Sequence, residues 1–139
     1  MKKRNIYKSP TGKLEVHVDD RGIIADVFYG ESINHVNVIE SIPNVIRGNH
    51  FHKLTEQHIL IIEGELEYWF WDRDSMQKPD YVVASVGDIV TSPPGEIHAL
   101  RIGAAGCRFV TFSMGPRGGS DYESDTYRTE NIIGPAQAD

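Results

Sequence analysis

The sequence predicts an all-β protein that folds as an antiparallel sandwich or barrel. Its apolar residues recur with a period of two, which places successive side chains on opposite faces of an extended strand. The apolar runs are short, and they are separated by Gly, Pro, Asp and Asn, which favour turns. No segment combines the length, the apolar spacing and the caps of a helix. We therefore expect strands that close into a barrel or a double sheet, because either arrangement protects strand edges.

Ten strands follow from this pattern, and each covers one stretch of alternation between turn residues. Several of them are rich in β-branched and aromatic residues, as in QHILIIE and LEYWFWD, which fit a pleated sheet. In order, the predicted strands cover residues 14–18, 23–29, 35–40, 45–52, 57–63, 66–72, 81–85, 88–92, 98–102 and 107–113.

The chain has the length of one domain. Its 139 residues, 40% of them hydrophobic, suffice to bury an independent core. We expect a single barrel over residues 1–113. Residues 114–139 are rich in Gly, Ser and acidic residues and predict a C-terminal loop and tail.

Charge and cysteine content restrict the partners and the compartment. A formal net charge of −6 argues against nucleic acid and an anionic membrane as partners, since both require a basic surface. The single cysteine, Cys107, cannot form an intramolecular disulfide and is expected to be a buried apolar residue in a reducing compartment. No apolar run has the length of a signal peptide or a membrane span, so we expect a cytoplasmic protein.

The stretch RGNHFHKLTEQ, residues 47–57, concentrates candidate ligands. His50 and His52 are two apart and point to one face of a strand. A turn would bring Gln57 back to face them, and the turn in GDIVTSPPGEIH would deliver His98. Neutral imidazole is the commonest transition-metal ligand, and an amide oxygen can complete a site. We therefore expect these four side chains to hold a divalent transition metal (Zn, Fe, Ni or Mn), with no organic cofactor.

These two stretches resemble the two sequence motifs of the cupin superfamily. GNHFHKLTEQHILIIEG has the paired histidines and the final glycine of the first motif, and GDIVTSPPGEIH has the Gly, Pro, Gly and His spacing of the second. The chain departs from the family at Gln57, where a glutamate ligand is most common, and at Ile102, which replaces an asparagine. The resemblance implies a double-stranded β-helix, the jelly-roll barrel of cupins.

A narrower resemblance covers Asp19 to Lys53. DDRGIIADVFYG followed by VIRGNHFHK is similar to the opening of nucleotide-sugar 3,5-epimerases of the dTDP-4-dehydrorhamnose type. It implies His50 as general base and Arg47 as a phosphate contact. The paired histidines also resemble the sugar 3,4-ketoisomerases, which implies His52 in proton transfer. RGNHFH and the later DTYR resemble the cupin domain of capsular-polysaccharide reductases.

The resemblance implies an isomerase or epimerase of a nucleotide-activated 4-keto sugar, in the making of a polysaccharide or glycoside. Removal of a proton next to a ketone requires a base with a pKa near neutrality, and histidine suits this task. The enolate needs a stabilising donor or cation, and an acid must return a proton. The epimerases use a tyrosine downstream of the second motif, whereas this chain has none there before Tyr122.

Two other functions are consistent with the same residues. In the first, His50, His52, Gln57 and His98 bind Fe, Ni or Mn in a small-molecule dioxygenase. In the second, the barrel is a non-catalytic module that binds a ligand or docks to a partner enzyme.

The remaining histidines and an aromatic run are assigned structural roles. His17, His35 and His58 lie outside the expected site, and His58 faces away from it by alternation. In YWFW, Tyr68 and Phe70 share one face and Trp69 and Trp71 share the other. Core packing accounts for one pair, and the other pair predicts a homodimer interface or an aromatic platform for a sugar or nucleobase.

Overall fold

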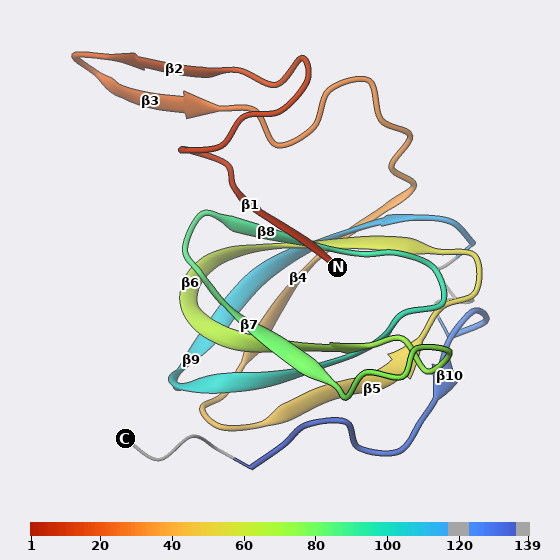
Figure 1. The fold of residues 1–139 in the computed structure, drawn as a ribbon. Coiled ribbons are helices and arrows are strands. Elements are labelled where there is room, and N and C mark those ends of the chain that lie inside the picture. The colour runs from red at the N-terminus through yellow and green to blue at the C-terminus, as the bar shows by residue number, and fades with distance from the viewer. Residues whose placement is uncertain (117–122, 136–139) are drawn as a thin grey trace.

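The chain forms a jelly-roll barrel of antiparallel strands, which confirms the all-β class and the double-stranded β-helix (Figure 1). The computed structural model describes residues 1–116 and 123–135. No helix in these two ranges is long and apolar enough to cross a membrane. The strands are β1 Lys2–Asn5, β2 Val16–Asp19, β3 Gly22–Ala25, β4 His35–Ser41, β5 Ile46–Phe51, β6 Glu56–Trp71, β7 Asp80–Ser85, β8 Asp88–Ser92, β9 Ile97–Met114 and β10 Tyr127–Arg128.

Eight of these strands belong to one continuous sheet that curls into the barrel. Its order is β1-β8-β6-β9-β5-β10, with β4 also paired to β9 and β7 also paired to β6. The strands β2 and β3 form a separate hairpin, which projects beyond the barrel in Figure 1. The two motif segments are adjacent because β5 pairs with the first part of β9.

The strands β6 and β9 are longer than the alternation predicts. The expected pairs 57–63 with 66–72, and 98–102 with 107–113, are each one bent strand, because the register shifts within the β6–β9 ladder without ending it. Gly64 has a φ of 79°, and a Cβ there would collide with the carbonyl oxygen of Gly106. A glycine at this bend thus keeps the strands paired where the sequence pattern suggests a turn.

The barrel interior is an apolar core of alternate residues from the long strands. Cys107 lies in this core, as the sequence predicts, and burial raises the pKa of its thiol to about 11. The other buried members are Ile59, Ile61, Leu66, Tyr68, Ala84, Val90, Leu100, Ile102 and Phe109.

Residues 123–135 pack against the outside of the barrel. The short strand β10 pairs with β5, and Ile132 and Ile133 form a second cluster with Trp69. Trp69 therefore has only 8% of its surface exposed and stacks on Tyr81 at a ring-centroid distance of 4.6 Å. Ile132 and Ile133 of the same chain therefore cover Trp69, so the aromatic run does not leave this ring exposed for a partner.

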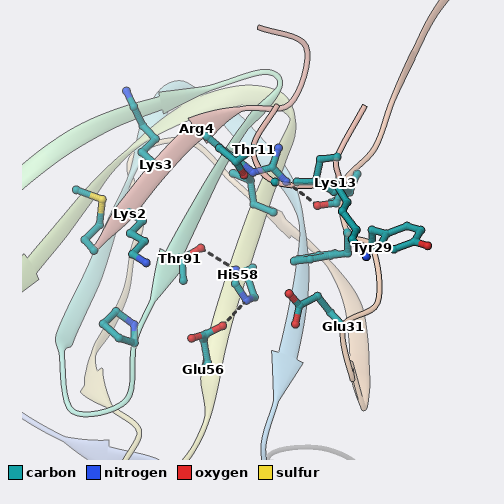
Figure 2. A pocket seen from close by; sticks show the side chains of 17 residues that line it. Lys2, Lys3, Arg4, Thr11, Lys13, Tyr29, Glu31, Glu56, His58 and Thr91 are labelled. Carbon is teal, nitrogen blue, oxygen red and sulfur yellow. Dashed lines mark hydrogen bonds and ion pairs between the residues drawn. The ribbon is translucent and has the colours of Figure 1, made fainter. Parts of the chain in front are cut away.

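A third cluster lies on the opposite side of β6, under the N-terminal segment. His58 lies next to it, with its ring edge-on to Phe28 at 5.0 Å, and Figure 2 shows its bonds to Thr91 and Glu56. His58 is thus a buried structural residue that faces away from the motif histidines. Of the other two, His17 is largely exposed and His35 begins β4.

Candidate functional site

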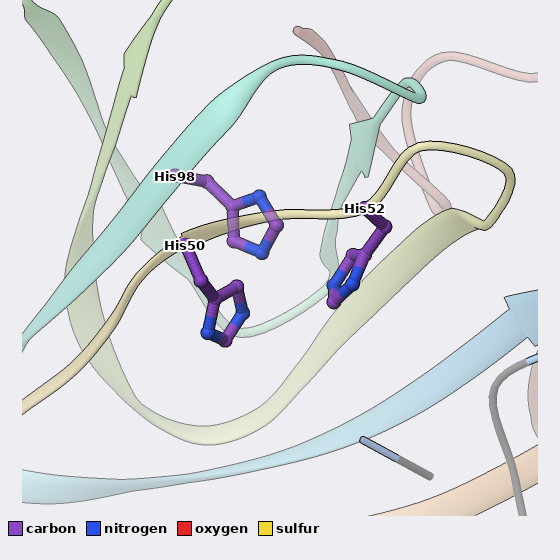
Figure 3. Close-up of side chains that lie close together, drawn as sticks. All are labelled: His50, His52 and His98. Carbon is purple, nitrogen blue, oxygen red and sulfur yellow. The ribbon is translucent and has the colours of Figure 1, made fainter. Parts of the chain in front are cut away.

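Three histidines from the two motifs converge in the structure (Figure 3). One ring nitrogen from each of His50, His52 and His98 lies within 4.8 Å of those of the other two. The ring centroids are 4.7 Å apart between His50 and His98, 5.0 Å between His50 and His52, and 5.2 Å between His52 and His98. His52 and His98 are buried and His50 is half-buried, so His50 offers the most accessible ring.

The sequence RGNH sets the position of His50 through a local irregularity in β5. The ladder with β9 shifts register between Gly48 and His50, and Asn49 between them has a φ of 57°. Gly48 has a φ of 88°, and a Cβ there would lie 2.8 Å from the carbonyl oxygen of His98. Glycine is therefore required for β5 to approach β9 closely enough to bring His50 and His98 together.

The turn of the second motif is joined to the first motif by a backbone hydrogen bond. The N–H of Gly95, in PPG, donates to the carbonyl oxygen of His52 at 2.6 Å. The Nδ1 of His98 lies 2.9 Å from the Ser92 hydroxyl and 3.3 Å from the carbonyl oxygen of Glu96. Since a carbonyl oxygen only accepts, this arrangement favours a proton on Nδ1 and a lone pair on Nε2 of His98.

His52 is oriented by a residue more than seventy positions later in the chain. Its Nδ1 lies 2.9 Å from the backbone carbonyl oxygen of Asp125. A neutral His52 therefore carries its proton on Nδ1 and its lone pair on Nε2. Metal-binding and basic histidines are commonly held in this way by a carbonyl acceptor on the second nitrogen.

The side chain of Asp125 fixes the loop that joins β5 to β6 within the first motif. Its carboxylate accepts the backbone N–H groups of Lys53, Leu54 and Thr55 at 2.9 to 3.0 Å. Burial alone would raise the pKa of Asp125, but these backbone hydrogen bonds outweigh it and hold the pKa below its ordinary value. The stabilising form is therefore the ionised carboxylate.

We expect Asp125→Asn to destabilise the chain by about 1–3 kcal/mol, because an amide cannot replace a charged acceptor of three N–H groups. Because the folded-state pKa is lowered, this stability is present above the unfolded pKa of about 4 and is lost as pH falls through the folded value. Urea unfolding from pH 7 down to pH 2 measures both effects. The exposed Asp74→Asn is the matched control; equal stability of the two variants at pH 7 would contradict the role of Asp125.

The other two predicted site residues, Gln57 and Arg47, lie in different surroundings from each other. Gln57 is buried and follows the alternation of β6 onto the inner face, between Ser92 and Ser113 of the neighbouring strands. Arg47 is exposed on β5, three residues before His50, and its guanidinium donates to the Ser41 hydroxyl and the Glu40 carbonyl oxygen. Gln57 thus shares the inner face of the barrel, whereas Arg47 is bound to the end of β4.

Three residues that sequence reasoning did not select support the cluster. Asp125 and Ser92 orient imidazoles, and the ring of Tyr68 stacks on His98 at 6.0 Å with an angle of 10°. Burial raises the pKa of Tyr68 well above its ordinary value, so its hydroxyl stays protonated. The DTYR stretch was the only sequence signal for Asp125. Tyr122, the first tyrosine after the second motif, lies outside the described residues.

The donor set of the cluster suits a transition metal. Three imidazoles, two of them with one ring nitrogen next to a carbonyl oxygen, match the preference of Zn, Fe and Ni sites for nitrogen ligands held by outer-sphere acceptors. The buried amide of Gln57 lies on the same inner face. The same three rings also suit proton transfer, since an imidazole can accept a proton on one nitrogen and donate one from the other.

Comparison with known proteins assigns the family. The model of the polysaccharide biosynthesis C-terminal domain matches residues 17–112, which include both motifs. The chain belongs to this family. The matched residues of this polysaccharide biosynthesis C-terminal domain extend from β2 into β9, and they include all three clustered histidines. Among curated proteins, none matches the sequence.

Solved structures confirm the cupin fold of this domain. The dTDP-6-deoxy-D-glucose-3,5-epimerase of Legionella pneumophila, in complex with dTDP-4-keto-L-rhamnose, has 16% identity and a TM-score of 0.66 over 84% of this chain and 69% of its own. The dTDP-4-dehydrorhamnose 3,5-epimerase of Bacillus anthracis, with TDP and PPi bound, has 19% identity and a TM-score of 0.65 over 78% and 73%.

A third similar structure is a larger protein. The capsular polysaccharide assembling protein CapF of Staphylococcus aureus has 22% identity and a TM-score of 0.62 over 87% of this chain. The chain spans only 35% of the length of that protein. These matches confirm the resemblance that the two motifs indicate, including the resemblance to the epimerases.

Proposed function

We propose that this domain is an isomerase or epimerase of a nucleotide-activated 4-keto sugar, active in the synthesis of a polysaccharide or glycoside. The convergence of His50, His52 and His98 inside a cupin barrel carries this proposal. It is supported by the family and by the fold shared with epimerases described as bound to dTDP-4-keto-L-rhamnose or TDP. Fold alone does not fix function, so the proposal depends on the site.

In the proposed reaction His50 is the base, because it is the most accessible ring of the cluster. Its lone pair takes the proton from the carbon next to the ketone, which leaves an imidazolium and an enolate. The imidazolium and the protonated hydroxyl of Tyr68 are donors on the inner face that favour this negative charge. A proton delivered from solvent to the opposite face of the carbon inverts the centre, and His50 then releases its own proton to solvent. Protonation of the former carbonyl carbon, with transfer of the neighbouring hydroxyl proton to the enolate oxygen, shifts the ketone.

His52 and Asp125 have a supporting role in this reaction. The Asp125 carbonyl keeps the Nε2 lone pair of His52 directed toward the cluster, so His52 can relay a proton to or from His50, 5.0 Å away between ring centroids. Arg47 is assigned to the diphosphate. Its planar guanidinium suits a bidentate phosphate contact and would have to exchange its bonds to Ser41 and Glu40 for the ligand.

Hydrogen exchange with solvent tests the proposal. The chain is incubated in D2O with a panel of nucleotide 4-keto sugars, and mass spectrometry measures deuterium on carbon. We expect the wild-type chain to introduce one or two deuterons into a substrate. A triple variant, His50→Gln, His52→Gln, His98→Gln, should introduce none. If no substrate gains deuterium but one binds, the domain is a non-catalytic binding module.

A metal-dependent dioxygenase is the second candidate, and the nitrogen donor set of the cluster favours it. His50, His52, His98 and Gln57 would hold the ion, which would supply Lewis-acid or oxygen chemistry when bound. We expect that any resident metal, measured by elemental mass spectrometry of protein purified without chelators, is lost in His98→Ala and kept in the exposed variant His17→Ala. About one equivalent of metal, with oxygen consumption, would favour the dioxygenase over the isomerase.

We also propose that two copies of the domain associate. The hairpin β2–β3 exposes apolar side chains on both of its faces, the paired Val18 and Ile23 on one and Ile24 on the other, with 46% to 69% of their surface accessible. Exposed apolar side chains on a projecting hairpin are costly in water and typical of a contact surface. Light scattering should give the mass of a dimer; the mass of one chain would contradict this proposal.

A further inference from the structure

A cavity lies on the outer face of the barrel, away from the histidine cluster. Its volume is about 820 Å³, and it is lined by residues of β1, β6 and β8 and of the segment 11–31. Figure 2 shows this cavity from close by. Among the described residues that line it are none of the three clustered histidines, so this cavity is distinct from the candidate site.

The cavity carries an excess of positive charge in an acidic chain. Its charged side chains are those of Lys2, Lys3, Arg4, Lys13, Glu31 and Glu56, and the N-terminal amine beside them is paired with Glu96. Of the lysines, Lys3 donates from Nζ to the carbonyl oxygen of Val83 at 3.1 Å. In the part of the chain that the structure describes, no ion pair joins any of the four cationic side chains to a carboxylate. Since the chain has a net charge of −6, this local excess favours an anionic ligand at the cavity.

Arg4 contributes the most specific evidence for an anion. Its Nη2 donates to the carbonyl oxygen of Val27 at 2.6 Å. Its Nη1 is buried and has no hydrogen-bond acceptor among the described residues. Burial also lowers the pKa of Arg4, because desolvation disfavours the charged guanidinium. An oxyanion next to Nη1 would satisfy the donor and balance the charge.

Glu56, one of the two acids in the lining, is held in place by a neighbouring imidazole. Glu56 accepts from His58 Nε2 at 2.9 Å, and the Nδ1 of His58 lies 2.7 Å from the Thr91 hydroxyl. These contacts fix one wall of the cavity as a rigid polar surface.

The remaining lining is apolar and aromatic. Lys13 Nζ lies 5.8 Å from the ring centroid of Tyr29, so a cation and an aromatic face are adjacent. The other apolar residues of the lining include Leu14, Val27, Phe28 and Ile89. A ligand that matches this wall carries a ring or an apolar group beside its anionic group.

We propose that this cavity binds a small organic phosphate. Its phosphoryl oxygens contact Arg4, Lys2 and Lys13, and its ring packs on Phe28 and Tyr29. This site goes beyond the proposed isomerase function and does not depend on it, because it uses a different face of β6.

Calorimetric titration of the full chain tests this proposal with two probes, inorganic pyrophosphate and thymidine diphosphate. The double variant Lys2→Gln, Lys13→Gln changes two exposed side chains and should preserve the fold. We expect it to weaken binding of both probes at this site by about tenfold or more, because each lysine supplies a charge-assisted contact. Lys8→Gln, an exposed lysine outside the lining, should leave the affinity unchanged.

Three results would overturn the proposal. One is the absence of saturable binding of either probe. Another is equal weakening by Lys8→Gln, which would indicate only general charge attraction. The third is binding that is lost in His98→Ala and kept in the lysine variant, which would place the ligand at the histidine cluster. Equal affinity for the two probes would overturn the ring contact with Phe28 and Tyr29.

Discussion

His50→Gln is expected to lower the rate of solvent-deuterium incorporation into a nucleotide 4-keto sugar by about 10²- to 10⁴-fold, the usual contribution of a general base. Glutamine keeps the polarity and approximate size of the side chain but has no lone pair of comparable basicity. Because His50 is only half-buried, the variant should unfold at nearly the wild-type urea concentration. Incubations quenched at successive times and analysed by mass spectrometry give the rate of deuterium incorporation.

Two controls separate a base from a structural residue. His17→Gln makes the same change at a side chain that is 69% exposed and should keep the wild-type rate. Asp125→Asn perturbs the loop next to His52 and should affect stability more than exchange. An exchange rate in His50→Gln within a factor of two of wild type would contradict its assignment as base.

Gly48→Ala is expected to destabilise the chain by roughly 3 kcal/mol. About 1–2 kcal/mol comes from a left-handed conformation, at a φ of 88°, and the rest from the contact of the new Cβ with the His98 carbonyl oxygen at 2.8 Å. The contact also separates β5 from β9, so His50 and His98 should move apart. Urea unfolding measures the stability.

Gly95→Ala is the matched control for this change. Gly95 has a φ of 87°, but a Cβ there would meet nothing within 4 Å, so only the conformational cost applies. The difference between the two variants isolates the backbone contact at Gly48. Equal destabilisation by the two substitutions would show that β5 and β9 have room to separate and that this glycine does not set the site.

The sequence predicts the fold class and the center of the site because both depend on local pattern. Period-two alternation identifies strands, and the spacing of two between His50 and His52 places both rings on one face. The second motif supplies His98 through a turn whose glycine, Gly95, has the left-handed conformation expected of PPG. These signals lie within a few residues of one another, so they can be read without knowing the tertiary structure.

Other parts of the structure depend on contacts between distant segments. Asp125 lies in a polar stretch expected to be loop and tail, yet its carboxylate binds three N–H groups that precede it by about seventy residues. The strand β1 is a run of polar residues with no apolar alternation, and it forms because the edge of β8 is available for pairing. Neither the periodicity nor the composition of a segment identifies the distant segment that it will pair with.

The aromatic run illustrates the same limit. Alternation correctly divides the four rings between two faces, and the pair that includes Tyr68 belongs to the core. It does not reveal that Ile132 and Ile133 return to cover Trp69. An exposed face inferred from one strand can be buried by another segment, and a dimer, if it forms, needs a surface other than Trp69.

The position of deuterium incorporation tests the central claim most directly. The intact chain and its His50→Gln variant are incubated in D2O with a dTDP-4-keto-6-deoxy sugar. Proton NMR follows the signals of the hydrogens on the two carbons next to the ketone. The proposed function predicts loss of at least one of these signals with wild type and retention of both with the variant. Retention of both signals with the wild-type chain, for a substrate shown to bind, would contradict it.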